Sequence, residues 1–152
     1  MIHYSKAKLS HVQQMQELVQ PYVDDGTILM RSADEIATNI RSYTLAFDDE
    51  LLVGFSALHI HTVKLAEIRS LIVSEQYREK GVGKELVAWG IEEGGKLGLE
   101  EVLVLTYKRA FFEKLGFYEI PKESLPEHKI WADCIKCKHF PLCNEVSLIK
   151  KY

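Results

Sequence analysis

The segment from Arg78 to Lys84, Arg-Glu-Lys-Gly-Val-Gly-Lys, has the composition of an anion-binding loop. It follows a run typical of a strand, 67–73, and precedes a run with helical spacing that begins near Val82. A turn between a strand and a helix exposes backbone N–H groups, and the helix N-terminus adds partial positive charge. Gly81 and Gly83 lack the Cβ that would keep a phosphate away. We therefore expect this segment to bind a diphosphate.

Two common phosphate-binding motifs, G-x-G-x-x-G and G-x-x-x-x-G-K-[ST], do not occur in the chain. Its own pattern is R-x-x-G-x-G, and a second segment, Phe-Phe-Glu-Lys-Leu-Gly-Phe, follows at 111–117. The two segments in this order resemble the GNAT acetyltransferase superfamily, in which the first one binds acetyl-CoA. The alternative is that the glycines only make a tight turn before an ordinary helix.

The resemblance implies a set of acetyl-CoA contacts. The backbone of Leu71 and Val73 would pair with the pantetheine arm, and the N–H groups from Arg78 to Lys84 would hold the pyrophosphate. Phe111 or Phe112 would pack on the pantetheine, although an aromatic pair on an amphipathic helix equally suits a core. The expected contacts are Leu71, Ile72, Val73, Arg78, Glu79, Lys80, Gly81, Val82, Gly83, Lys84, Phe112 and Lys114.

Acetyl transfer to an amine requires a base, a donor to the oxyanion and a leaving thiolate. Glu67 is the expected base, because the matching position in several GNAT enzymes is a glutamate. The alternative is an exposed strand residue paired with Arg69. Many family members carry a tyrosine that protonates the thiolate, but the matching residue here is Phe112, so Tyr107 is the alternative donor or else a half-buried core residue. A backbone N–H near Leu71 or Ile72 would stabilise the oxyanion.

Three further segments resemble N-acetylglutamate synthase and related amino-acid N-acetyltransferases. They are G-x-x-L-x-R-S at 26–32, A-E-I-R-S-L at 66–71 and L-P-E-H-K at 125–129. Guanidinium groups bind carboxylates in two-point geometry, so Arg31 and Arg69 are expected to hold an amino-acid acceptor. Arg31 could equally be a surface residue, and Arg69 could pair with Glu67. The expected hydroxyl donors to the acceptor are Ser32, Ser70 and Thr106.

We therefore expect acetyl transfer to the α-amino group of an amino acid, with L-glutamate favoured, as in arginine biosynthesis. An acidic cleft built from Asp24, Asp25 and Asp34 would instead favour a protein N-terminus, a lysine or another small amine. A non-catalytic acyl-CoA-binding module is a third alternative, because the family's tyrosine is replaced by phenylalanine.

Composition limits the class of protein further. The chain has 152 residues, of which 47% are hydrophobic, and a net charge of −3, which suits a single domain and disfavours nucleic-acid binding. No apolar run approaches the length of a membrane span, and the N-terminal residues lack the apolar core of a secretion signal. With three cysteines, these features indicate a cytoplasmic protein. GNAT proteins often dimerise, and the sequence leaves a homodimer open.

The cysteines lie close together near the C-terminus, at Cys134, Cys137 and Cys143. C-x-x-C is a frequent half of a zinc site, but the spacing to the third cysteine matches no standard pattern, so we favour reduced cysteines packed in a lid over a metal site. We expect one domain over 1–152, with an irregular segment at about 126–152. His59 and His61 are two apart in an expected strand and so share a face. They could line the acceptor cleft, but a polar face of an antiparallel sheet is the more common case, so we leave them out of the site.

These residues require a particular order of elements to position them. The expected strands span residues 2–6, 43–47, 51–61, 67–73, 102–105 and 117–120, with a final strand over 145–149. The expected helices span 10–23 with Ser10 as N-cap, a short segment ending near 41 capped by Ser32 or Asp34, 82–97, and 110–115 closed by Gly116. This order indicates an α/β protein. It resembles the GNAT fold, a mixed, mostly antiparallel central sheet flanked by helices.

Overall fold

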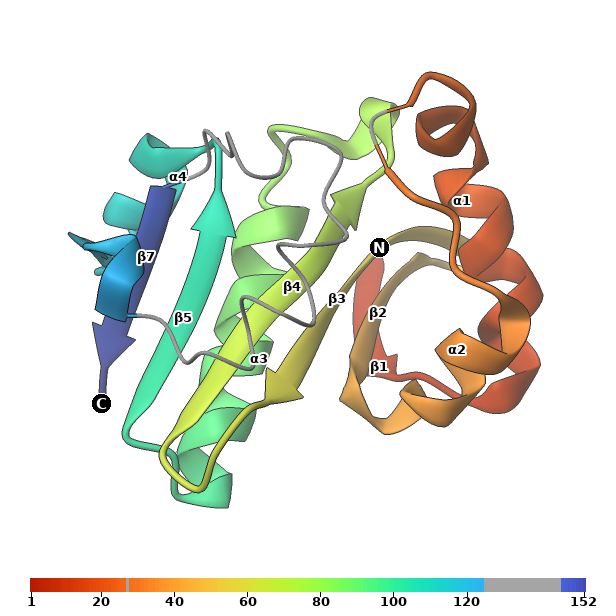
Figure 1. Cartoon of the computed structure of the whole chain (residues 1–152). Coiled ribbons are helices and arrows are strands. Elements are labelled where there is room, and N and C mark those ends of the chain that lie inside the picture. The colour runs from red at the N-terminus through yellow and green to blue at the C-terminus, as the bar shows by residue number, and fades with distance from the viewer. Residues whose placement is uncertain (27, 125–145) are drawn as a thin grey trace. The chain divides into compact units, whose positions relative to one another are not determined.

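The structure is a computed structural model, and it describes residues 1–26, 28–124 and 146–152 (Figure 1). The strands are β1 (Ile2–Lys6), β2 (Tyr43–Asp48), β3 (Leu51–Ile60), β4 (Leu65–Val73), β5 (Glu101–Thr106), β6 (Tyr118–Ile120) and β7 (Val146–Lys151). The α-helices are α1 (Val12–Asp24), α2 (Ala33–Thr38), α3 (Val82–Leu97) and α4 (Arg109–Glu113). Short 3₁₀ turns are η1 (Leu9–His11), η2 (Ile40–Ser42), η3 (Glu75–Tyr77) and η4 (Lys122–Ser124). Among these helices, none is long and apolar enough to cross a membrane.

The described strands form one sheet in the order β1-β2-β3-β4-β5-β7-β6. Strands β1 and β2, β2 and β3, β5 and β7, and β6 and β7 pair antiparallel, whereas β4 and β5 pair in parallel. The parallel pairs are Leu65↔Glu101, Ala66↔Val102 and Glu67↔Leu103. The predicted mixed, mostly antiparallel sheet is therefore confirmed.

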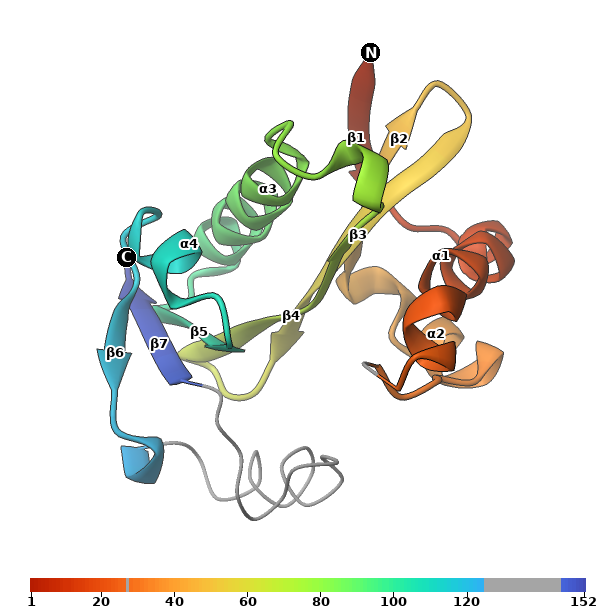
Figure 2. The same cartoon turned by 90° about the horizontal axis from the view of Figure 1, so that it is seen from above.

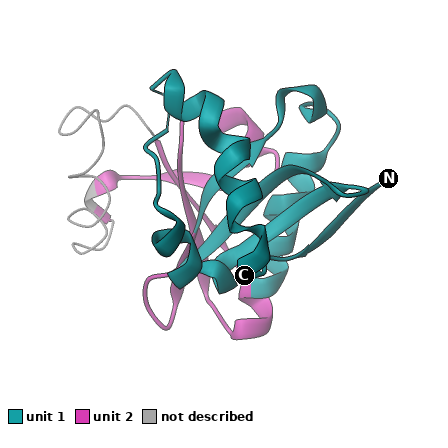
Figure 3. Ribbon diagram, turned by 90° about the vertical axis from the view of Figure 1, so that its right-hand side faces the viewer, with its two compact units in different colours: residues 1–59, 68–93 teal, residues 60–67, 94–152 magenta. Residues whose placement is uncertain are grey.

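The chain divides into two compact units, which Figure 3 colours separately. The first unit contains residues 1–59 and 68–93, and the second contains 60–67 and 94–152. Strand β4 contributes to both units, since the division falls between Glu67 and Ile68.

The first unit buries apolar side chains on both faces of its strands. Met15 of α1 and Ile36 of α2 pack with Leu45 of β2 and Phe55 of β3 on one face. On the other face, the buried residues of α3 pack against β2 and β3; this second cluster is Ala46, Val53, Val82 and Leu86. The result is a strand layer between α1 and α2 on one side and α3 on the other (Figure 2).

Strand β4 contains one residue in the left-handed region, Ser70, with φ of 57°. Side chains normally alternate between the two faces of a strand. Here Leu71 and Val73 pack in the α3 cluster, whereas Ile72 packs in the cluster of α1 and α2. An added Cβ on Gly90 of α3 would meet Ile68, so Ile68 also faces α3. Ser70 thus adds one residue between Ile68 and Leu71 in the manner of a β-bulge.

The second unit buries apolar side chains around β5. Val102, Leu103 and Val104 are all buried, as is Leu148 of β7. Phe112 of α4 is also buried, and its ring packs edge-to-face on those of Phe111 and Phe117, 4.9 and 5.4 Å away between centroids. Burial of β5 on both faces agrees with its continuous apolar sequence.

Most predicted elements are present, and several boundaries are as expected. Strand β1 and helix α3 have the predicted limits, and Ser32 caps α2 by accepting a hydrogen bond from the Glu35 N–H. The predicted cap at Ser10 is wrong, because η1 precedes α1 and His11 is the N-cap. The final strand runs to Lys151, so the expected irregular segment over 126–152 is wrong for 146–151. The single-domain organisation stays a prediction.

Gly54 of β3 provides a test of how closely strands and helix pack. An added Cβ would lie 2.8 Å from the Ile72 carbonyl oxygen and 3.4 Å from side-chain atoms of Val82 and Leu86. Because a backbone atom cannot rotate away, we expect Gly54→Ala to lower the free energy of unfolding by about 1–3 kcal/mol. Urea denaturation would measure the change.

Gly90→Ala is the matched control for Gly54→Ala. Its added Cβ would meet only the Cδ1 of Ile68, at 2.6 Å, at the flexible end of that side chain. Alanine is also favoured over glycine in a helix by about 1 kcal/mol. We expect this variant to stay within about 1 kcal/mol of the parent protein. If Gly54→Ala were as stable as Gly90→Ala, the close packing at Gly54 would be disproved.

Candidate active site

The loop between β4 and α3 has the backbone conformation of an anion site. Glu79 and Gly81 both have positive φ, 66° and 83°, and successive left-handed and right-handed residues turn backbone N–H groups toward one side. The Gly81 carbonyl accepts a hydrogen bond from the Glu85 N–H at 3.0 Å, so Gly81 begins the helix. The first N–H groups of α3 therefore have no intrahelical acceptor. Together with the helix dipole, they can bind a diphosphate.

Two basic side chains of this loop already have defined positions. The Arg78 guanidinium donates to the Tyr22 hydroxyl at 2.6 Å and to the Val73 carbonyl at 3.3 Å. The Lys80 ammonium lies 5.2 Å from the centre of the Tyr77 ring, within the range of a cation–π interaction. Both contacts keep positive charge beside the loop, where it would attract a diphosphate.

Tyr77 fixes the start of the loop to the β2–β3 turn. Its hydroxyl donates a hydrogen bond to the Asp48 carboxylate at 2.6 Å. This hydrogen bond, followed by one from the N-terminal ammonium, lowers the pKa of Asp48 below its ordinary value. The same bond raises the pKa of Tyr77, since deprotonation would break it. The loop thus begins from an anchored residue.

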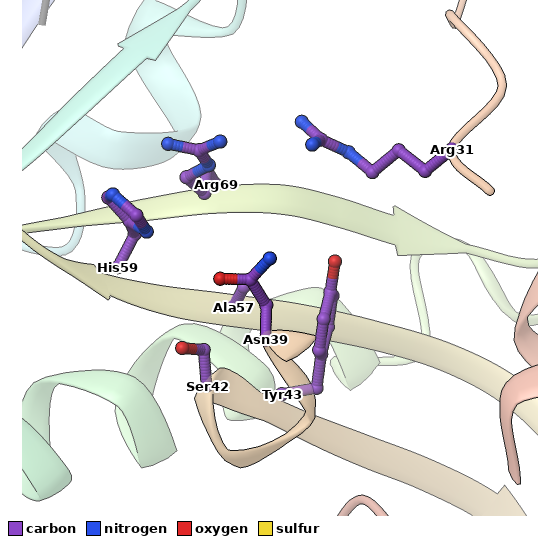
Figure 4. A pocket seen from close by; sticks show the side chains of 7 residues that line it. All are labelled: Arg31, Asn39, Ser42, Tyr43, Ala57, His59 and Arg69. Carbon is purple, nitrogen blue, oxygen red and sulfur yellow. The ribbon is translucent and has the colours of Figure 1, made fainter. Parts of the chain in front are cut away.

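Arg31 and Arg69 both line one small recess in the first unit (Figure 4). Its other lining residues are Asn39, Ser42, Tyr43, Ala57 and His59. Figure 4 shows the Arg31 side chain reaching from its loop toward Arg69 on β4. The recess has a volume of about 20 Å³, close to the room that one water needs. It therefore suits one end of a ligand, such as a carboxylate, better than a whole amino acid.

The position of Arg31 follows from its neighbours. Its carbonyl accepts a hydrogen bond from the Gln16 amide of α1 at 3.3 Å, and the next residue, Ser32, caps α2. Its guanidinium lies 3.9 Å from the Glu35 carboxylate. At this distance and with 43% of the side chain exposed, such a pair is weak, so the guanidinium can rearrange toward an anionic ligand.

Glu67 is the one buried residue among the aspartates, glutamates, lysines and arginines of the described chain. Its Oε1 lies 2.9 Å from Nε2 of His61, and the two side chains are 4% and 3% exposed. Burial removes it from bulk water, as expected of a base that acts on an enclosed substrate. The alternative, that Glu67 is an exposed strand residue, is therefore wrong.

The other predicted site residues have varied surroundings. Phe112 is 3% exposed within the aromatic cluster of the second unit, and the Tyr107 side chain is 60% exposed. The Thr106 hydroxyl accepts a hydrogen bond from the Lys108 N–H at 2.8 Å, and Lys114 is exposed at the end of α4. Their roles toward acetyl-CoA or the acceptor stay predictions.

The sequence did not predict two groups of residues that lie at the recess or beside Glu67. Asn39, Ser42, Tyr43 and His59 line the recess with the two arginines, and His61 contacts the Glu67 carboxylate. The His-x-His spacing was the available signal, but polar alternation on a strand fits a solvated face equally well. Only the three-dimensional contacts separate the two interpretations.

The three cysteines considered as an alternative metal site, Cys134, Cys137 and Cys143, lie outside the described residues. Within residues 1–26, 28–124 and 146–152, no group of three or more histidine, cysteine or acidic side chains is arranged to hold a metal ion. The L-P-E-H-K segment at 125–129 also lies outside the described part of the chain.

Comparisons with known proteins bear on the family and the fold of the chain. Residues 12–117 match the acetyltransferase (GNAT) family. An uncharacterized N-acetyltransferase of Chlorobaculum tepidum is 38% identical over 95% of this chain and 92% of its own length. An amino-acid acetyltransferase of Vibrio vulnificus is 29% identical over 74% of this chain and 26% of its own length, so this chain spans about a quarter of that relative.

A solved structure with a similar fold is N-acetylglutamate synthase from Neisseria gonorrhoeae, complexed with coenzyme A and N-acetyl-glutamate. It superposes with a TM-score of 0.87 at 23% identity, over 99% of this chain and 35% of that chain. At this identity the likeness concerns the fold.

The Asp48–Tyr77 hydrogen bond predicts a pH-dependent stability. Because the pKa of Asp48 is lowered on folding, its contribution is present above the unfolded value of about 3.9 and is lost as the pH falls through the lower folded value. We expect Asp48→Asn to melt at a lower temperature than the parent protein near neutral pH, with the difference narrowing below about pH 4.

Asp49→Asn is the control for Asp48→Asn, since it removes a carboxylate from the same turn and leaves the Tyr77 hydrogen bond in place. Its melting temperature should follow that of the parent protein across the pH range. A deficit of Asp48→Asn that stayed constant down to strongly acidic pH would show that the carboxylate does not act through its ionised form.

Proposed function

Because the chain belongs to the acetyltransferase (GNAT) family, we propose that it transfers the acetyl group of acetyl-CoA to the α-amino group of an amino acid, with L-glutamate as the acceptor. The observation that carries the choice of acceptor is the recess shared by Arg31 and Arg69. Two guanidinium groups in one recess favour a carboxylate ligand. The relatives named as amino-acid acetyltransferases point to the same class of substrate.

The charge of the recess separates this proposal from a protein or polyamine acceptor. An acceptor rich in amines would be attracted by acidic side chains, and none of the seven described residues that line the recess is acidic. Asp24, Asp25 and Asp34, which an acidic cleft would need, do not line the recess. The balance of charge therefore supports a carboxylate-bearing acceptor.

In the proposed reaction, acetyl-CoA lies with its diphosphate on the backbone N–H groups from Arg78 to Lys84. The acceptor ammonium gives a proton to Glu67, and the nitrogen lone pair attacks the thioester carbon. A new C–N bond forms, and the oxyanion is stabilised by a backbone N–H near Leu71 or Ile72. The C–S bond then breaks with its electron pair on sulfur, and the nitrogen, which still carries two protons, releases one of them to water to give the neutral amide.

The leaving thiolate needs little help, because a thiol with a pKa of about 8.5 is a tolerable leaving group near neutral pH. Phe112 cannot donate a proton, and its burial supports a structural role in the second unit. Tyr107, whose side chain is 60% exposed, is our candidate for protonating the sulfur.

A turnover assay tests the proposed function. Release of the free thiol from acetyl-CoA would be followed with a panel of acceptors: L-glutamate, L-glutamine, L-aspartate, L-lysine and an amine without a carboxylate. We expect the highest kcat/KM with L-glutamate. Turnover only with amines that lack a carboxylate, or coenzyme A binding without any turnover, would contradict the proposal.

Arg31→Ala tests the carboxylate site directly. Loss of a hydrogen bond between charged groups costs about 1.5–3 kcal/mol, so we expect the acceptor KM to rise about tenfold or more. The KM for acetyl-CoA should not change, since Arg31 lies outside the predicted diphosphate loop. An unchanged acceptor KM would remove Arg31 from the site.

Arg109→Ala is a matched control for Arg31→Ala. Arg109 also pairs with a glutamate four residues later, Glu113, and its side chain is 51% exposed compared with 43% for Arg31. It does not line the recess. Its removal should leave the acceptor KM unchanged, which excludes a general effect of losing a surface arginine.

Glu67→Gln tests the catalytic base. General base catalysis contributes about 100- to 10,000-fold to a rate, so kcat should fall by a factor in this range, with smaller changes in either KM. Glu100→Gln, in an exposed pair with Lys64, is the control and should retain the parent kcat. If Glu67→Gln also retained it, another group would have to accept the proton.

A further inference from the structure

His61 and Glu67 form a buried pair, and the proposed reaction assigns a role to Glu67 but none to His61. Nε2 of His61 lies 2.9 Å from Oε1 of Glu67, and only 3% and 4% of the two side chains are exposed. A buried carboxylate is costly unless it accepts hydrogen bonds. The imidazole ring of His61 therefore supplies a hydrogen bond to the Glu67 carboxylate in place of water.

The turn between β3 and β4 is built to hold this histidine. The Thr62 hydroxyl accepts hydrogen bonds from the N–H groups of Lys64 and Leu65, at 3.1 and 3.0 Å. The His61 N–H donates to the Leu65 carbonyl at 2.9 Å. Both ends of the turn are thus tied together, and the ring of His61 is fixed beside the side chain of Glu67.

The charged side chain of Lys64, in the same turn, forms an ion pair at the surface. Lys64 lies 4.0 Å from Glu100, and both side chains are more than 60% exposed. In the sheet, Glu67 lies opposite Leu103 of β5, and Ala66 lies opposite Val102. Ala66, Val102 and Leu103 are apolar and fully buried. His61 is thus a titratable side chain in direct contact with the Glu67 carboxylate.

We propose that His61 is a positioning residue for the catalytic base. It donates its Nε2–H to Oε1 of Glu67, and this bond fixes the plane of the carboxylate and directs Oε2 toward the acceptor ammonium. The proton passes from the ammonium to Oε2, while the nitrogen lone pair forms the C–N bond and the thiolate takes the C–S electron pair. This inference rests on the proposed function, in which Glu67 is the base.

A His61→Leu variant removes the donor, and His61→Gln retains an amide N–H that can reach Oε1. A misdirected base costs about 10- to 100-fold in rate, so we expect kcat of His61→Leu to fall by this factor with both KM values within about threefold of the parent. His61→Gln should recover most of the lost kcat. A merely structural histidine would change the melting temperature without this pattern.

The control is His11→Leu. His11 packs on the aromatic ring of Phe47 and accepts a hydrogen bond from the Lys8 N–H, and it belongs to η1 in the first unit. Its loss should lower stability and leave kcat unchanged. A fall in kcat equal to that of His61→Leu would overturn the inference.

A double-mutant cycle gives a readout that does not depend on stability. If His61 acts through Glu67, adding His61→Leu to Glu67→Gln should lower kcat by less than about twofold. An equal loss of kcat from His61→Leu in both backgrounds would overturn the positioning role. Absence of turnover by the parent protein with any amino acid would instead refute the proposed function, and full activity of Glu67→Gln would refute the base, so the three failures are distinguishable.

Discussion

The candidate site depends on the backbone conformation of one continuous segment, strand β4 and the loop that leads from it into α3. Positive φ angles occur at Ser70, Glu79 and Gly81. For residues other than glycine, this conformation costs about 1–3 kcal/mol and tends to occur at functional positions. In this segment, the first such angle changes which face of β4 the following side chains occupy, and the other two turn N–H groups toward a common side.

In this segment, the apolar residues of β4 that pack against α3 are different residues from those whose side chains are predicted to take part in the reaction. Leu71 and Val73 pack toward α3, which fixes the strand against the helix whose N-terminus would bind the diphosphate. Arg69 lines the recess with Arg31, and Glu67 lies two residues earlier on the same strand. Strand β4 therefore contains the predicted base and one of the two arginines predicted for the acceptor.

Local patterns were sufficient to predict the parts of the fold that local physics determines. The apolar spacing of 82–97 gave the limits of α3, and a hydroxyl before an acidic turn gave the Ser32 cap. Long-range pairing was beyond such patterns: β7 lies between β5 and β6. In the site, Arg31 and Arg69 were predicted from the segments that resemble amino-acid N-acetyltransferases, together with the affinity of guanidinium groups for carboxylates. The contact of His61 with Glu67 depends instead on the turn formed by Thr62, whose geometry the residue types alone do not specify.

The central claim is that backbone N–H groups at the start of α3 bind the diphosphate of coenzyme A. The most direct measurement is an NMR titration with coenzyme A that follows the amide proton and nitrogen shifts of each residue. The account predicts that the amides of Gly81, Val82 and Gly83 are among those that shift most, because a bound diphosphate accepts their hydrogen bonds. Binding that left these amides unshifted, or no binding at millimolar concentration, would contradict it.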